Sequence, residues 1–122
     1  MDHDTAERFA EEWIAAWNAH DLDRILVPYA EDVVFASPHV VDILGEPSGE
    51  VHGKRALRDY WAKGLRDFSP RLHFTLQDVK TSRDTVVITY RNERGQSVSE
   101  CLTFRGDEVC AGFAAYGRVP AT

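Results

Sequence analysis

The chain has 122 residues and a net charge of −6, and hydrophobic residues make up 43% and charged residues 28% of it. This length fits one domain, residues 1–122, and the balance is that of an ordinary globular protein. Arginine and lysine are scattered without a basic cluster, which argues against DNA or RNA as a main partner. The acidic balance also disfavours a highly anionic substrate unless a local cationic site exists.

Nothing in the sequence indicates a membrane or export segment. No apolar run approaches the length of a membrane span. The acidic start, from Met1 to Asp4, leads straight into a predicted helix and does not resemble a signal peptide. Two cysteines are too few for a disulfide framework. We therefore expect a cytoplasmic protein that does not enter a membrane.

The first helix is predicted from an aromatic stripe. Phe9, Trp13 and Trp17 recur every fourth residue, so their side chains share one helix face. Asp4 is expected to cap this helix, because Glu7 stands three residues on, as in a capping box. The helix should end within a few residues of Trp17.

Two further helices and one strand are expected in the next fifty residues. Asp21 should cap a short second helix that ends or kinks near Pro28, since proline removes a backbone donor. Residues 33–37 begin with an apolar run and predict a short strand. Residues 38–52 are expected to form a long loop that could open or shut a pocket. Residues 54–68 predict a third helix with its own aromatic face.

The pattern then changes to a period of two, which predicts four antiparallel strands in a meander. Turn signals at residues 82–84, 93–95 and 106–107 separate the strands. Helices first and strands afterwards indicate the α+β class, with the helices packed on one face of the sheet. The positions in one phase are Leu72, Phe74, Leu76, Val86, Ile88, Tyr90, Val98, Glu100, Leu102, Phe104, Val109, Ala111, Phe113 and Ala115.

The last hairpin also predicts a register. If residues 106–107 form a two-residue loop, uninterrupted pairing places Glu100 opposite Phe113. Cys101 and Cys110 then lie diagonally rather than opposite each other. We therefore expect both cysteines to be free thiols.

Glu100 is the residue that breaks the apolar pattern. It lies in phase with Val98 and Leu102, on the face that should meet the helices. A buried carboxylate is costly, so it must find a partner, stay near water or hold its proton. A raised pKa would suit a general acid or base near neutral pH. A structural anchor, bonded to a Trp indole or a Tyr hydroxyl, is the alternative.

An apolar pocket is expected between the helices and the sheet, although aromatic side chains at helical spacing can equally fill a core. Ser37 could present its hydroxyl at the mouth of this pocket, or could begin the turn at Pro38. The candidate lining residues are Trp13, Trp17, Phe35, Ser37, Tyr60, Trp61, Tyr90, Phe104 and Phe113.

The sequence contains no recognisable metal-binding or cofactor-binding motif. His39, His52 and His73 do not have metal-ligand spacing, so no metal site is predicted. The sequence also lacks a nucleophile motif, a glycine-rich phosphate loop and a dinucleotide fingerprint, so no cofactor is expected.

Three segments, residues 17–23, 29–35 and 53–61, make the chain resemble the nuclear transport factor 2-like superfamily, and its SnoaL-like branch in particular. The resemblance extends over nearly the whole chain. It implies a strongly curved sheet wrapped around the helices in a cone, with a pocket at the wide end. It also implies a bacterial protein that acts on small molecules.

The resemblance further implies a homodimer, because many members pair through the outer face of the sheet. In this chain that face would carry Val87, Thr89, Cys101 and Thr103.

Ketosteroid isomerase is the chemical comparison within the superfamily. Matching by segment, Trp13 stands at the place of its helix-one Tyr, Ser37 at the place of its catalytic Asp, and Glu100 at the place of its second acid. The missing base at Ser37 argues against that isomerase activity.

Three functions remain open. The first is a cofactor-independent isomerase, cyclase or dehydratase that acts on a small hydrophobic substrate with Glu100 as the acid/base group. The second is a non-catalytic binder of an apolar metabolite. The third is a structural or dimerising module with a filled core.

Overall fold

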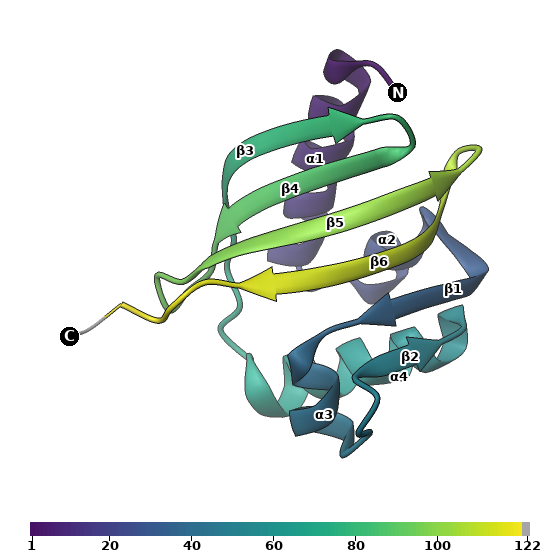
Figure 1. The fold of residues 1–122 in the computed structure, drawn as a ribbon. Coiled ribbons are helices and arrows are strands. Elements are labelled where there is room, and N and C mark those ends of the chain that lie inside the picture. The colour runs from purple at the N-terminus through teal and green to yellow at the C-terminus, as the bar shows by residue number, and fades with distance from the viewer. Residues whose placement is uncertain (121–122) are drawn as a thin grey trace.

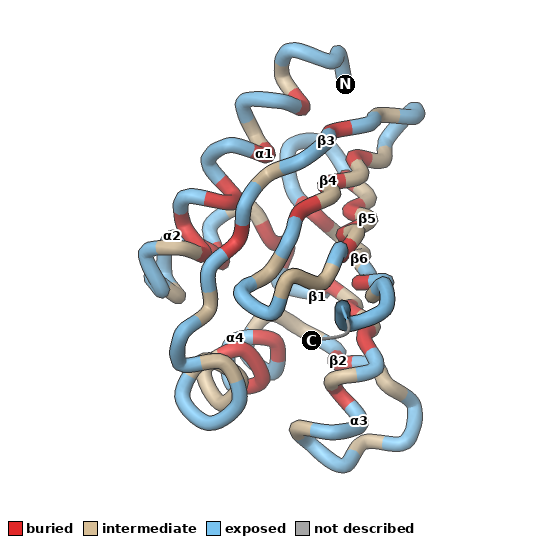
Figure 2. The backbone as a smooth tube through the Cα atoms, turned by 90° about the vertical axis from the view of Figure 1, so that its left-hand side faces the viewer, coloured by how far each residue is buried: buried red, intermediate tan, exposed pale blue. Residues whose placement is uncertain are grey.

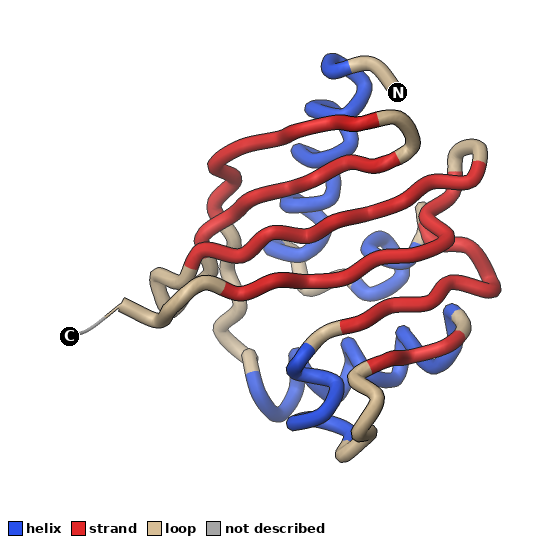
Figure 3. The backbone as a smooth tube through the Cα atoms, viewed as in Figure 1, coloured by secondary structure: helices blue, strands red, loops and turns tan. Residues whose placement is uncertain are grey.

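The computed structural model describes residues 1–120. In this part of the chain, six strands form one curved, open sheet in the order β2-β1-β6-β5-β4-β3, and α1, α2 and α4 lie behind it (Figures 1 and 3). The helical elements are α1 (His3–Asn18), α2 (Leu22–Leu26), α3 (Pro38–Leu44), α4 (Lys54–Lys63) and the π-helical turn η1 (Gly64–Phe68). The strands are β1 (Tyr29–Ala36), β2 (Glu50–His52), β3 (Thr75–Ser82), β4 (Thr85–Arg91), β5 (Ser97–Arg105) and β6 (Glu108–Tyr116). The expected α+β class is confirmed.

The first helix buries the predicted stripe. Trp13 and Trp17 are buried, and Phe9 is half-buried against the core. The predicted cap is wrong, because Asp2 rather than Asp4 caps the helix. The Asp2 carboxylate accepts a hydrogen bond from the backbone N–H of Thr5 at 2.8 Å, so the helix begins before Asp4.

The second and third predicted helices are confirmed with small changes. Asp21 caps α2, which ends at Leu26, two residues before Pro28. The third helix extends to Phe68, but its last turn, η1, is π-helical. The first strand begins at Tyr29, four residues earlier than predicted, and it pairs antiparallel with β2 and parallel with β6.

Residues 38–52 do not form the predicted long loop. Ser37 caps α3 by accepting a hydrogen bond from the backbone N–H of His39, and Pro38 occupies the first helical turn. Gly45 ends the helix with φ 69°, a left-handed conformation that glycine adopts without strain. β2 then pairs with β1, so residues 38–52 form a helix and an edge strand of the sheet instead of a loop.

The four-strand meander is confirmed, but its last hairpin contains a β-bulge. Arg105 pairs with Glu108 as predicted, and the register then shifts at Cys110. Because one extra residue on β6 reverses the side on which every later side chain lies, Glu100 pairs with Ala114 and not with Phe113. Phe113 therefore lies on the outer face, with 51% of its surface exposed, and its predicted inward orientation is wrong.

The core lies between α1, α4 and the inner face of the sheet. Buried positions alternate along β4 and β5 and recur along α1 (Figure 2). Among residues 1–120, Ser37 and Glu100 are the buried polar residues. Cys101 and Cys110 are free thiols, as predicted. The described helices include none that has both the length and the apolar character needed to span a membrane.

Gly112 marks a place where β6 and its neighbours pack too closely for a side chain. A Cβ atom at Gly112 would lie 2.9 Å from Leu102 Cδ2 and 3.4 Å from Phe35 Cδ1. We expect Gly112→Ala to lower the free energy of unfolding by roughly 1–3 kcal/mol, because the packed core must shift to accept the methyl group. Urea denaturation measures this change.

The matched control is Ala115→Ser, which also adds one atom to β6 but on the exposed face. It should change stability by less than about 0.5 kcal/mol. Equal effects of the two substitutions would contradict the packing described for Gly112.

Candidate functional site

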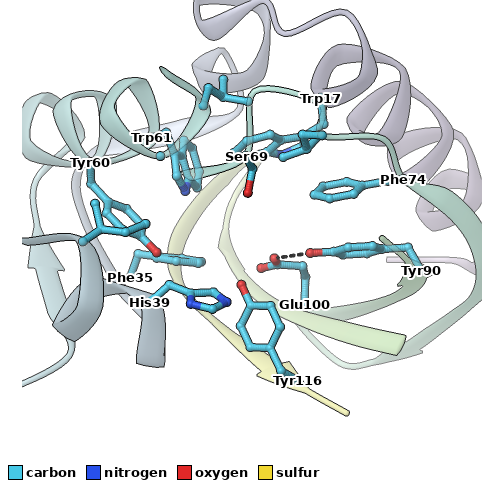
Figure 4. A pocket seen from close by; sticks show the side chains of 14 residues that line it. Trp17, Phe35, His39, Tyr60, Trp61, Ser69, Phe74, Tyr90, Glu100 and Tyr116 are labelled. Carbon is cyan, nitrogen blue, oxygen red and sulfur yellow. Dashed lines mark hydrogen bonds between the residues drawn. The ribbon is translucent and has the colours of Figure 1, made fainter. Parts of the chain in front are cut away.

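A cavity of about 90 Å³ lies between the inner face of the sheet and the helical elements. Side chains from α1, β1, α3, α4 and η1 form one side, and β4, β5 and β6 contribute Tyr90, Glu100 and Tyr116 on the other (Figure 4). The complete lining is Trp17, Phe35, His39, Ile43, Tyr60, Trp61, Gly64, Leu65, Ser69, Leu72, Phe74, Tyr90, Glu100 and Tyr116. The lining is mainly aromatic and aliphatic, with a few polar groups pointing inward.

Glu100 is the one carboxyl group in this lining. β5 is a central strand, flanked by β4 and β6, so the Glu100 side chain projects from the middle of the sheet with only 6% of its surface exposed. Its Oε1 accepts a hydrogen bond from the Tyr90 hydroxyl at 3.0 Å. Burial raises the pKa of Glu100 to about 8, and the bond from Tyr90 opposes part of this rise. At neutral pH the carboxyl group is therefore mainly protonated.

Tyrosine hydroxyls surround this carboxyl group and stay neutral. Burial raises the pKa of Tyr60 to about 12, against a lowering by the nearby Ser37 side chain. Burial, followed by the charge of Glu100, also raises the pKa of Tyr116 and of Tyr90. In Figure 4 the Tyr116 hydroxyl is turned toward Glu100. The Tyr90 hydroxyl donates its hydrogen bond to Glu100, whereas the neutral hydroxyls of Tyr60 and Tyr116 can donate to a ligand.

His39 enters the site from α3. Its ring packs edge-on against Tyr116, with 4.5 Å between the ring centroids. Its Nδ1 lies 3.5 Å from Oδ2 of Asp42, one helical turn further on. Asp42 and Tyr116 thus fix the orientation of an imidazole at the rim of the cavity.

Trp17 supplies an unpaired donor. Among residues 1–120, its Nε1 is the single buried side-chain nitrogen or oxygen without a hydrogen-bond partner. Its ring packs edge-on against Trp61, with the centroids 4.9 Å apart. A buried donor of this kind lowers stability unless something pairs with it, so a ligand with an oxygen acceptor would relieve that cost.

The cavity gathers six of the candidate residues named from the sequence. The six that line it are Trp17, Phe35, Tyr60, Trp61, Tyr90 and Glu100. The other four candidates lie outside its lining. Trp13 lies deeper and donates a hydrogen bond to the Tyr29 hydroxyl at 3.0 Å. Phe104 packs on Phe9 with 5.1 Å between centroids, Ser37 caps α3, and Phe113 faces outward.

Sequence reasoning missed several lining residues for identifiable reasons. Tyr116 falls on the inner face only because of the bulge at Cys110, which the alternating pattern does not show. His39 reaches the lining because residues 38–44 form α3, and the Ser37-Pro38 start and Gly45 end of this helix are the sequence signals that point to it. Phe74 and Leu72 approach the cavity from the segment that precedes β3.

In the described part of the chain, no group of three or more His, Cys, Asp or Glu side chains lies close enough together to hold a metal ion. The chemistry that the arrangement can provide is proton transfer by Glu100 and hydrogen bonding by neutral hydroxyl and indole groups.

The family model that matches this chain and the solved structures that resemble it agree with one another. The model of the SnoaL-like domain matches residues 10–122. A crystal structure of a SnoaL-like protein of unknown function from Burkholderia thailandensis is 40% identical, covers 96% of this chain and 98% of that one, and has a TM-score of 0.90. A structure of an NTF2-like protein from Anabaena variabilis is 20% identical, with coverages of 97% and 95% and a TM-score of 0.76.

No curated protein shows significant similarity to the chain. The family match covers nearly the whole sequence, and the 40% identical structure has the same fold over nearly its full length. The chain therefore belongs to the SnoaL-like domain family, and it shares its fold with NTF2-like proteins.

Proposed function

We propose that the cavity binds a small, mainly apolar molecule and that Glu100 acts on it as a general acid and base, without a cofactor. The observation that carries this proposal is a lone carboxyl group with a pKa of about 8 inside an aromatic cavity. A group with a pKa near the working pH is present in both protonation states, which suits proton transfer in either direction. Isomerisation next to a carbonyl, cyclisation and dehydration are the reactions that fit.

In this proposal the protonated Glu100 gives its proton to an oxygen or carbon of the substrate, and the resulting carboxylate later takes a proton back. The Tyr90 hydroxyl, 3.0 Å from Oε1, stabilises the carboxylate formed between these steps. Tyr116 and the Trp17 N–H are neutral donors that could hold a developing negative charge on a substrate oxygen.

The cavity volume restricts the size of the substrate portion beside Glu100. A water molecule occupies roughly 30 Å³ of liquid, and a dry cavity of about 150 Å³ holds benzene. The cavity of about 90 Å³ is smaller than that. The proposed substrate therefore places only a few heavy atoms beside Glu100.

A non-catalytic binder of an apolar metabolite is the second candidate. The observation in its favour is that Ser37, at the place of the catalytic base in ketosteroid isomerase, is engaged as the cap of α3. The cavity would then hold a ligand, with Glu100 as a hydrogen-bonding group only.

We also propose that the protein is a cytoplasmic homodimer that pairs through the outer face of the sheet. Phe113 and Val41 are exposed by 51% and 42%, and Phe113 lies beside Cys101 on β5. Phe113 and Val41 line one surface hollow together with Ala114, and contiguous exposed apolar surface supports an interaction site. Free thiols at Cys101 and Cys110 are consistent with a reducing compartment.

The proposed chemistry predicts a large loss of turnover in Glu100→Gln. Small ketones, lactones and terpenoids that stabilise the protein in thermal-shift assays would be incubated with it, and products followed by NMR. The variant should lose roughly 100-fold or more in kcat, since Gln cannot exchange the proton, while ligand-induced thermal shifts persist. Equal turnover by both proteins would refute the acid/base role. Binding without conversion by the wild type would favour the binder.

The burial of Glu100 predicts a pH-dependent stability. Its pKa is about 8 in the folded state and about 4.3 in an unfolded chain, so between these values the folded state holds more protons. Stability from this group is therefore present at low pH and is lost as pH rises from about 5 to 8. Relative to wild type, Glu100→Gln should gain up to about 1.4 kcal/mol per pH unit across this window. Urea denaturation at several pH values measures the difference, and a constant difference would contradict a protonated Glu100.

The proposed dimer predicts that Phe113→Asp yields a monomer. In a dimer of the variant, the new carboxylate would be buried in the interface without a partner. In the monomer, the same carboxylate is solvated, so the monomer is favoured. Sedimentation equilibrium of both proteins tests this. Val27→Asp, which also replaces an exposed apolar side chain but follows α2 on the helical side of the domain, is the control and should leave the assembly state unchanged. A monomeric wild type would refute the dimer.

A further inference from the structure

A second, outer cavity of about 70 Å³ adjoins the cavity that contains Glu100. The two share six lining residues, so they meet along a common wall: His39, Ser69, Leu72, Phe74, Tyr90 and Tyr116. In Figure 4 the Ser69 hydroxyl points into the space between the helical side of the pocket and Glu100. One elongated molecule could therefore extend from the inner cavity into the outer one.

The polarity of the walls changes between the two cavities. Residues that line only the inner cavity are largely aromatic or aliphatic, with Glu100 as the charged exception. Residues that line only the outer cavity are all polar, and all four come from the β4–β5 hairpin: Asn92, Glu93, Arg94 and Gln96. A ligand that fills both cavities would thus be apolar at one end and polar at the other.

Two of the four hairpin side chains are engaged mainly by the hairpin itself. Asn92 Nδ2 donates to Gln96 Oε1 at 3.0 Å, and Asn92 Oδ1 accepts from the backbone N–H groups of Arg94 and Gln96. Gln96 Nε2 donates to the carbonyl oxygen of Gly117 at 2.7 Å. These amides shape the wall and leave little capacity for a ligand.

Arg94 keeps most of its donors free. Its Nη2 makes one long hydrogen bond, 3.4 Å, to the carbonyl oxygen of Phe68, and its Nε lies 3.9 Å from Oε2 of Glu93. Glu93 is itself engaged, because its Oε1 accepts from the backbone N–H of His73 at 3.4 Å. Within residues 1–120, the other guanidinium N–H groups of Arg94 have no hydrogen-bonding partner in the protein.

We propose that the two cavities form one site for an amphipathic monocarboxylic acid, whose carboxylate binds Arg94 and whose apolar chain lies beside Glu100. The planar guanidinium offers paired N–H donors that match the two oxygens of a carboxylate. The chain has a net charge of −6, which disfavours the binding of an anion. Arg94 provides a local positive charge in the outer cavity that offsets this repulsion. This inference rests on the proposed function, because it names the class of molecule that the same pocket takes.

The test titrates butanoate, hexanoate and octanoate, with octanamide as the neutral comparator, into wild type, Arg94→Gln and Glu93→Gln. Isothermal titration calorimetry gives Kd, and tryptophan fluorescence reports on the inner cavity, because Trp17 and Trp61 line it. Gln at position 93 can still accept the bond from His73, so that variant removes only the competing charge.

We expect wild type to bind octanoate more tightly than octanamide, with Kd falling along the series from butanoate as the chain fills the inner cavity. Arg94→Gln should raise the Kd of octanoate about tenfold, and it should leave that of octanamide within about twofold. Glu93→Gln should lower the Kd of octanoate, because the competing carboxylate is gone. Higher salt should weaken octanoate binding, since Arg94 is half-exposed.

Several results would overturn the proposal. Equal affinities of wild type for octanoate and octanamide, or an unchanged octanoate Kd in Arg94→Gln, would remove the role of Arg94. A Kd independent of chain length, or no change in tryptophan fluorescence, would indicate a surface ion pair outside the inner cavity. Failure of all the carboxylates to bind would also overturn it.

The results separate this inference from the proposed function. If octanamide or another neutral compound changes the tryptophan fluorescence and Arg94 makes no difference, the pocket stands and the carboxylate subsite falls, while the turnover assay of Glu100→Gln decides the acid/base role. If octanoate binding depends on Arg94 while no bound compound is ever converted, the subsite stands and the catalytic role of Glu100 falls.

Discussion

The burial of one carboxyl group in the middle of the sheet is the constraint on which the rest of the site depends. Glu100 projects from β5 toward the helices, where water is almost excluded. Such a group must stay protonated or find donors, and here it does both, because its pKa is about 8 and Tyr90 donates to it. The aromatic side chains around it make the charged form costly, and the neutral hydroxyls supply the hydrogen bonds.

The β-bulge at Cys110 decides which residues share a face with that carboxyl group. With an uninterrupted ladder, Phe113 would lie beside Glu100 and Tyr116 would face outward. The extra residue reverses this arrangement, so that Tyr116 faces Glu100 and Phe113 is exposed on the outer face. A single irregularity in one strand thus gives the cavity a phenol and gives the outer face a large apolar side chain.

The cavity wall is assembled from segments that are distant in sequence. α3 contributes His39, η1 and the segment after it contribute Leu65, Ser69 and Leu72, and the end of β6 contributes Tyr116. The β4–β5 hairpin reaches the same region, where Arg94 bonds to the carbonyl oxygen of Phe68. These contacts join the π-helical turn to the hairpin at the junction of the apolar and polar cavities. π-Helical turns are frequent at functional sites, which is consistent with this position.

The sequence alone determined the fold class, the aromatic stripe of α1, the meander and the inward position of Glu100. Each of these follows from a local period of four or two, or from a single residue that interrupts such a period. The tertiary structure alone decided the register of β6 and the grouping of His39 and Tyr116 around Glu100. Register and grouping depend on contacts between residues that lie far apart in the chain, and no periodic pattern in a single segment encodes them.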